Sequence, residues 1–201
     1  MYMVQPQVTP EYTAIPAFRR AMVFIDGENL VCCYQRMLKN GRQQIADIGL
    51  THIQDVLVWC SNFIMNAGLS EILRATYYTY AVGSYEMIDE IRGTIKNLAF
   101  SRHINSRLPN TLTPQVFKKE KKSVRAKGVD IQMTVDILNH VHRDNIDTVM
   151  LFSGDGDYIP VIEEVLRCGK QCHISAFSDG LNPKLIHIAD GFDYLDSRIF
   201  L

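Results

Sequence analysis

The sequence predicts an α/β fold with a mainly parallel central sheet and helices on both of its faces. Short apolar, β-rich segments alternate along the chain with longer segments whose apolar residues recur at helical spacing. Tandem repeats and low-complexity segments are absent, so the 201 residues fit one domain with a decorated edge. This domain is predicted over residues 20–201, after an extended, proline-containing arm at residues 1–19.

The composition is that of an ordinary globular domain, with 47% hydrophobic and 21% charged residues. A net charge of -1 gives no overall attraction to nucleic acid or membrane, so a polyanionic partner needs a local basic patch. No apolar stretch approaches the ~18 residues of a membrane span, and the N-terminus does not resemble a secretory signal. We therefore expect a cytoplasmic protein with no membrane partner.

The cysteines indicate reduced thiols rather than a disulfide framework, because their number is odd and no CxxC pair occurs. None of them has a nearby Cys or His at the spacing of a zinc site, and the histidines form no HExxH motif. A zinc site is therefore not expected. The five cysteines are Cys32, Cys33, Cys60, Cys168 and Cys172.

The first predicted strand, residues 21–25, is short and fully apolar, and it ends at an acid beside a glycine, Asp26 and Gly27. A helix is expected from about residue 30 to residue 39, because Asn40-Gly41 is a typical stop signal.

A second helix is predicted over residues 53–66, where the apolar residues form a stripe at helical spacing. Residues 72–82 contain a β-rich run and are expected to form an inner strand, followed by an amphipathic helix over 85–100. Residues 103–117 are ambiguous, with an edge strand at 103–108, a turn and another short strand as the expectation.

The second half of the chain continues the alternation of helices and strands. The strand before Ser153 is β-branched and apolar, as a buried strand should be. Pro160 lies in the first turn of the next helix, where its missing N–H does no harm. The expected elements are a helix at 129–138, a strand at 148–152, a helix at 158–168, a strand at 171–177 and a short helix within 181–195.

Two carboxylates, Asp155 and Asp157, follow the strand at 148–152 directly. Small residues around them let the backbone turn sharply, and in open α/β sheets ligands bind at this carboxyl edge. The alternative is that Asp-Gly-Asp is only turn chemistry. Ser153, in the same turn, is a further candidate site residue.

Asp26 and Asp130 add to this group of acids. Asp26 ends the first strand, and Asp130 lies where a helix begins after a basic segment. If the two strands are neighbours, roughly 5 Å apart, their terminal carboxylates face one pocket. Carboxylates so close repel unless a divalent cation neutralises them, and oxygen ligands favour Mg²⁺ or Mn²⁺. Such an ion can generate a hydroxide nucleophile for phosphodiester cleavage.

Two further polar residues are open to more than one interpretation. Asn29 is either the N-cap of the first helix or a residue that orients a metal-bound water. Asp136 lies six residues after Asp130, ~120° away around a helix, so it is either an additional ligand or a polar residue satisfied by its neighbours.

A basic segment precedes Asp130 and is a candidate for holding an RNA backbone beside the carboxylates. The alternative is an ordinary solvated loop. Tyr34 and Tyr158, near strand ends, are better candidates for base stacking than the tyrosines at 77, 78 and 80, which are expected to serve packing. The candidate RNA-binding residues are Lys118, Lys119, Lys121, Lys122, Arg125 and Lys127.

Three motifs in this order resemble the NYN domain family of the PIN-like nuclease superfamily, which includes the LabA-like proteins. They are Val23-Phe-Ile-Asp-Gly-Glu-Asn-Leu30, Lys127-Gly-Val-Asp-Ile-Gln-Met-Thr-Val-Asp136 and Leu151-Phe-Ser-Gly-Asp-Gly-Asp-Tyr158. The resemblance covers roughly residues 20–196, and the stretch 40–70 is long for the first crossover of the family.

The resemblance implies a PIN-like three-layer α/β/α sandwich and a Mg²⁺- or Mn²⁺-dependent ribonuclease. Asp26, Asp130 and Asp155 are then the metal-binding acids, and Asn29 and Asp157 assist catalysis. The expected partner is single-stranded RNA. The alternative is a catalytically silent RNA-binding or regulatory scaffold module with the same fold, and a protein partner or a second copy of the chain is also compatible with the sequence.

A phosphohydrolase with a covalent aspartate nucleophile is disfavoured. Such chemistry usually needs an Asp-x-Asp pair after the first strand, and here Asp26 is followed by Gly-Glu-Asn.

Overall fold

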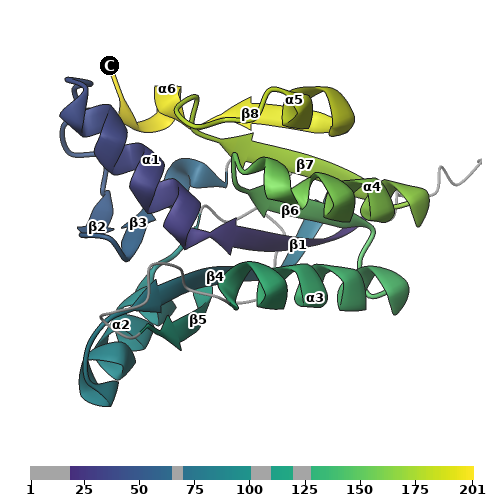
Figure 1. Ribbon diagram of the computed structural model, residues 1–201, viewed down its shortest axis with the longest axis horizontal. Helices are drawn as coiled ribbons and strands as arrows, with labels where there is room; N and C mark the ends of the chain where they lie inside the picture. The colour runs from purple at the N-terminus through teal and green to yellow at the C-terminus, as the bar shows by residue number, and fades with distance from the viewer. Residues whose placement is uncertain (1–18, 65–69, 101–109, 120–127) are drawn as a thin grey trace, which may run out of the picture.

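The protein is built around a six-stranded sheet in which every neighbouring pair of strands is parallel (Figure 1). The computed structural model describes residues 19–64, 70–100, 110–119 and 128–201. The strand order is β5-β4-β1-β6-β7-β8, so the predicted parallel sheet is confirmed. The strands are β1 (Arg19–Asp26), β4 (Ser70–Ala81), β5 (Leu112–Lys118), β6 (Thr148–Phe152), β7 (Gln171–Ala176) and β8 (Gly191–Tyr194).

Helices cover both faces of the sheet, which confirms the three-layer α/β/α arrangement. The alternation of side chains along β1 divides the core. Val23 and Ile25 pack with α1, α2 and α6, whereas Phe24 packs with α3, α4 and α5 on the other face. The helices are α1 (Gly27–Lys39), α2 (Tyr85–Asn97), α3 (Val129–His142), α4 (Ile159–Arg167), α5 (Lys184–Ile188) and α6 (Asp196–Ile199).

The helix predicted over residues 53–66 is wrong. This segment contains an antiparallel hairpin, β2 (Thr51–Ile53) and β3 (Leu57–Trp59), followed by a short 3₁₀ turn, η1 (Ser61–Phe63). Asp55 takes the left-handed conformation that a tight turn needs, with a φ of 59°. The side chains from Leu57 to Cys60 are all buried, as in a strand enclosed on both sides, so the apparent helical stripe was accidental.

Other boundaries differ by smaller amounts. The C-terminal strand β8 and helix α6 were not predicted, because each has only four residues, too few for a clear periodicity. The predicted edge strand at 103–108 and residues 1–18 of the arm lie outside the described residues. No helix among the described segments is long and apolar enough to cross a membrane.

The connections make the carboxyl ends of β1 and β6 the point at which the order of the strands reverses. From β1 the chain moves to β4 and β5 on one side of the sheet, and it then returns to β6, β7 and β8 on the other side. The helices that follow β1 and β6, α1 and α4, lie on opposite faces. Such a topological switch point is where open α/β sheets bind their ligands.

Gly27 permits the close approach of α1 to strand β4. A Cβ atom at this position would lie 2.3 Å from Cε1 of Tyr77 and 2.7 Å from the backbone oxygen of Tyr78. The Tyr77 ring is buried and its hydroxyl is hydrogen-bonded to the backbone of Val58, so it cannot easily move away. The glycine beside Asp26 therefore serves packing.

The variant Gly27→Ala is expected to lower the free energy of unfolding by about 1–3 kcal/mol, because overpacking forces the backbone to shift. Gly93→Ala is the matched control, because a Cβ there has nothing within 4 Å and alanine favours a helix. Urea denaturation checks both variants. Equal stability of Gly27→Ala and the wild type would contradict this account of the contact.

Candidate active site

Asp26 is the buried centre of the candidate site. It ends β1 beside β6, with Ile25 paired to Phe152, so the two strands are neighbours as predicted. The Asp26 side chain accepts hydrogen bonds from the backbone N–H of Asn29 at 3.0 Å and from the hydroxyl of Ser153 at 2.9 Å. With 3% of its surface exposed, Asp26 is thus held in one orientation.

Burial raises the pKa of Asp26 from 3.8 to about 7, although its two hydrogen bonds act in the opposite direction. The negative charges of Asp130 and Asp155 add to the increase. The carboxyl groups of Asp130 and Asp155 therefore influence that of Asp26 electrostatically.

The turn after β6 is tied to the first turn of α1. The backbone N–H of Gly154 donates to Oδ1 of Asn29 at 3.0 Å, and the backbone N–H of Asp155 donates to the Ser153 hydroxyl at 3.1 Å. The N-cap of α1 is Asp26, so the interpretation of Asn29 as the cap is wrong. Asn29 instead bridges the two loops that carry the acids.

Asp155 and Asp157 lie on the outer side of this turn. Asp155 is half-buried and caps the short 3₁₀ turn η2 (Gly156–Tyr158), accepting from the backbone N–H of Asp157 at 2.9 Å. Asp157 itself is exposed. The turn-chemistry interpretation therefore accounts for one oxygen of Asp155, which is compatible with a ligand role for the other.

Asp130 reaches the site from the start of α3, where the helix dipole favours a carboxylate. Its Oδ1 accepts a hydrogen bond from the hydroxyl of Tyr158 at 3.2 Å. Partial burial and the charges of Asp155 and Asp157 raise the pKa of Asp130. Tyr158 is buried, so its suggested role in base stacking is wrong, and it positions Asp130 instead. Tyr34 is buried as well.

The donor set fits a hard divalent cation that keeps part of its water shell. Among the described residues, the only group of three His, Cys, Asp or Glu side chains with ligand atoms within 4.8 Å of one another lies elsewhere. Asp26, Asp130 and Asp155 are therefore more widely spaced than that. Two ligand atoms on one Mg²⁺-sized ion lie at most ~4.2 Å apart, so in this geometry the three carboxylates do not all reach one ion directly, and at least one would act through a bound water.

Glu28 is an additional acid of the site, and the sequence interpretation missed it. It is half-buried, and its pKa is raised by burial and by the charge of Asp130, while Lys119 lowers it. The nearby Tyr80 hydroxyl also lowers the pKa of Glu28, and the Glu28 charge raises the pKa of Tyr80. The available signal was its place in Asp-Gly-Glu-Asn, directly after a buried strand.

Asp136 is turned away from this group. Its Oδ2 accepts from the hydroxyl of Tyr78 and its Oδ1 accepts from Nε2 of Gln132, each at 2.8 Å. The bond from Tyr78 holds α3 on β4, and the bond from Gln132 lies within α3, so both oxygens are satisfied. The contacts favour the interpretation of Asp136 as a satisfied structural residue over that of an additional ligand.

Two of the predicted RNA-binding lysines lie against aromatic rings at the end of β5. The Nζ atom of Lys118 lies 3.8 Å from the ring centroid of Tyr85, and that of Lys119 lies 4.1 Å from the centroid of Tyr80. Lys119 also influences the pKa of Glu28, which places it beside the acids. The other four, Lys121, Lys122, Arg125 and Lys127, lie outside the described residues.

The comparison with protein families decides the classification. The NYN domain model matches residues 20–196, which is nearly the whole chain. The chain belongs to the NYN domain family. NYN domains are nuclease-like members of the PIN-like superfamily, and such domains generally use divalent metals. The acids described above lie within the matched part of this NYN domain.

One solved structure is consistent with this fold, and one sequence relative matches a part of the chain. A crystal structure of a protein of unknown function from Vibrio parahaemolyticus is similar with a TM-score of 0.60 and 16% identity, covering 93% of this chain and 99% of that one. An uncharacterised protein from Methanocaldococcus jannaschii is 33% identical over 67 residues. This match spans 33% of the chain but only 28% of the archaeal protein.

Proposed function

We propose that this NYN domain is a ribonuclease that depends on Mg²⁺ or Mn²⁺ and hydrolyses RNA phosphodiesters with an activated water. The observation that carries the proposal is the buried Asp26, whose carboxyl pKa is raised to about 7 and whose neighbours Asp130 and Asp155 add negative charge. Removing the Asp26 carboxylate from water has a stability cost that a structural role alone does not explain. A bound divalent cation would offset this cost, because it neutralises the charge of the carboxylates.

The metal-binding acids and the residues that orient them would have different roles. Asp26, Asp130 and Asp155 would hold the ion. The hydrogen bonds from Ser153 to Asp26 and from Tyr158 to Asp130 fix the orientation of these carboxylates. When bound, the ion supplies a water of lowered pKa and stabilises the negative charge that develops on the phosphoryl oxygens.

Three further residues would position the metal-binding acids or assist them. Asn29 links the turn after β6 to α1 and so keeps Asp155 beside Asp26. Asp157 is exposed at the rim, where it can assist by accepting a proton or orienting a water. Glu28 adds a further carboxylate on the side toward Lys119.

The lysines beside the acids would hold the RNA backbone. Lys118 and Lys119 extend the site along the carboxyl ends of β4 and β5, and Tyr85 is 68% exposed beside Lys118. Lysines and exposed aromatic rings are the elements with which proteins bind single-stranded nucleic acid. The lysines and the arginine at 121–127 follow Lys119 closely in the sequence and are further candidates for such contacts.

Replacing Lys118 and Lys119 together by alanine is expected to weaken binding of a single-stranded RNA. Each lost phosphate contact should also reduce the slope of log K against log salt concentration by about 0.7. Fluorescence anisotropy at several salt concentrations measures both quantities. Lys39→Ala, at the far end of α1, is the control and should leave the slope unchanged.

The chemistry of the product ends tests the proposed reaction. Attack by water leaves no 2′,3′-cyclic phosphate, so an RNA with a single 2′-deoxynucleotide at the cleaved position should still be cut there in Mn²⁺. Cyclic phosphate ends, or protection by the 2′-deoxy substitution, would contradict attack by an activated water. RNA binding without cleavage in either metal would favour the silent regulatory module.

A further inference from the structure

A second cluster of metal-binding side chains lies where α3 and α4 end. His142 is the last residue of α3, Glu164 lies in α4, and Cys168 is the C-cap of α4. One ligand atom from each lies within 4.8 Å of the other two. We propose that His142, Glu164 and Cys168 form a binding site for a thiophilic divalent cation such as Zn²⁺. This site goes beyond the proposed nuclease activity and does not depend on it.

The spacing of the three ligand atoms fits a tetrahedral ion. Zn²⁺ lies 2.0–2.3 Å from nitrogen, oxygen and sulfur ligands, so neighbouring ligand atoms are about 3.3–3.6 Å apart. Oε1 of Glu164 lies 3.4 Å from Nε2 of His142 and 3.6 Å from Sγ of Cys168. His142 and Cys168 are exposed and Glu164 is half-buried, so water could fill the fourth position.

The backbone around the cluster also favours a positive ion. Helices α3 and α4 pack against each other on one face of the sheet, and both end at the same side of the molecule (Figure 1). Each helix C-terminus carries partial negative charge from its last carbonyl groups. Glu164 and Cys168 are four residues apart, so one helical turn places them on the same side of α4.

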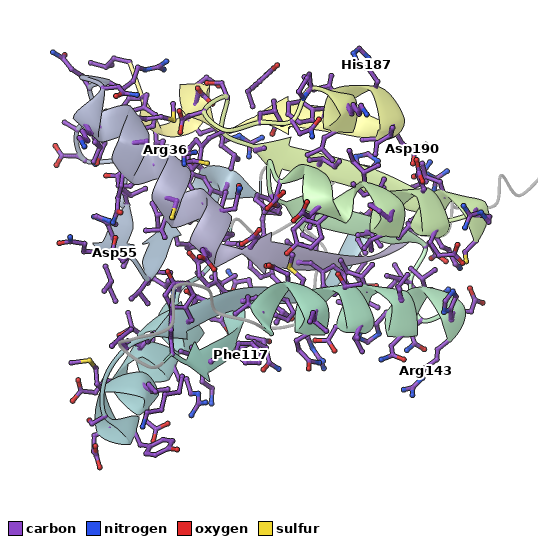
Figure 2. The ribbon with its side chains drawn as sticks, in the orientation of Figure 1. Arg36, Asp55, Phe117, Arg143, His187 and Asp190 are labelled. Carbon is purple, nitrogen blue, oxygen red and sulfur yellow. The ribbon has the colours of Figure 1, made fainter. Side chains whose placement is uncertain are left out.

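The nearby arginines leave the cluster accessible. Arg167 forms its ion pair with Oε2 of Glu164, whereas the contacts to His142 and Cys168 involve Oε1. Arg143, the C-cap of α3, is directed away from the body of the protein (Figure 2). The second carboxylate oxygen can therefore stay paired while the first binds a metal.

The cluster is remote from the candidate active site and differs from it chemically. Asp130, the second residue of helix α3, lies at the acidic site, and the helix ends at His142, about 18 Å further along its axis. Sulfur and imidazole ligands select Zn²⁺ over Mg²⁺ or Mn²⁺, whereas the acidic site has oxygen ligands. The spacing typical of a zinc site is not visible in the sequence, because His142 and Cys168 lie at the ends of different helices.

Titration of the tag-free full chain with Zn²⁺, in competition with a chromophoric chelator, tests the proposal. We expect one bound equivalent that persists in Asp155→Asn. Cys168→Ser and His142→Ala should each weaken it by at least about tenfold, since even outer-sphere changes cost 10–100-fold. Cys32→Ser, the control at another exposed cysteine, should bind as the wild type does. Equal affinity of Cys168→Ser and the wild type would overturn the proposal.

Substitution with Co²⁺ distinguishes ligation from indirect effects. A thiolate-to-Co²⁺ charge-transfer absorption is expected in the wild type and in Cys32→Ser, and it should be absent from Cys168→Ser. Glu164→Gln, which retains the helix, should weaken Co²⁺ binding without changing the circular dichroism. Absence of the thiolate band in the wild type would show that Cys168 is not a ligand.

Discussion

Replacing Asp26 by asparagine is expected to stabilise the metal-free protein above pH 7 while it removes RNA cleavage. The carboxyl pKa of Asp26 is raised from 3.8 to about 7, mainly by burial, so the folded state binds its proton more tightly than the unfolded state. Stability of the wild type therefore falls as the pH rises from 3.8 to about 7 and then stays constant. Asparagine is neutral and avoids this loss.

The expected difference in stability follows from the increase in the pKa of Asp26. At 1.36 kcal/mol per pH unit, the loss that asparagine avoids is at most about 4 kcal/mol above pH 7 and close to zero near pH 4. Mn²⁺ should reduce the advantage, because an ion that binds the ionised carboxylate stabilises only the wild type.

Urea denaturation in EDTA at a series of pH values measures this difference. Glu90→Gln, an exposed change of the same type on α2, is the control and should be neutral at every pH. If Asp26→Asn were no more stable than the wild type above pH 7, the ionised Asp26 would not destabilise the folded protein. That result would contradict a functional origin for its burial.

Replacing Asp155 by asparagine is expected to reduce RNA cleavage by at least about 10²-fold, because losing several kcal/mol of metal-assisted stabilisation costs a factor of ten per 1.36 kcal/mol. RNA affinity should change little, because the lysines that would hold the backbone remain. The backbone N–H of Asp157 can still donate to the amide oxygen of the new side chain, so the turn is expected to keep its shape.

Single-turnover cleavage and anisotropy measured on the same preparations separate these effects. Glu163→Gln makes the same chemical change at an exposed position of α4 and serves as the control. Loss of binding and cleavage together in Asp155→Asn would indicate a folding defect. Unchanged cleavage would contradict a metal-ligand role for Asp155.

The convergence of the acids could be predicted because each follows a strong local signal. Asp26 and Asp155 come after the apolar ends of β1 and β6, and parallel neighbours must bring their carboxyl ends to one edge. The hydrogen bonds that orient them could not be predicted. That Tyr158 would be buried and hold Asp130, or that Asn29 would contact Gly154, depends on tertiary packing between distant segments.

The failures in the fold have a similar origin. The hairpin at 51–59 was mistaken for part of a helix because an apolar run of four buried residues satisfies both periodicities. Strand β8 is stabilised by pairing with β7, and four residues carry too little local information to reveal that. The long helices α1, α2 and α3 were predicted well because their apolar faces repeat over several turns.

The most direct test of the account is the metal dependence of RNA cleavage by the wild-type chain. Purified, tag-free protein should be incubated with a labelled single-stranded RNA in EDTA, and again after an excess of Mn²⁺ is added. If a carboxylate-held ion is the source of activity, no cleavage is expected in EDTA and cleavage is expected after addition of Mn²⁺. Asp26→Asn should cleave in neither condition. Cleavage that persists in EDTA, or that Asp26→Asn retains, would contradict a carboxylate-held ion as the source of activity.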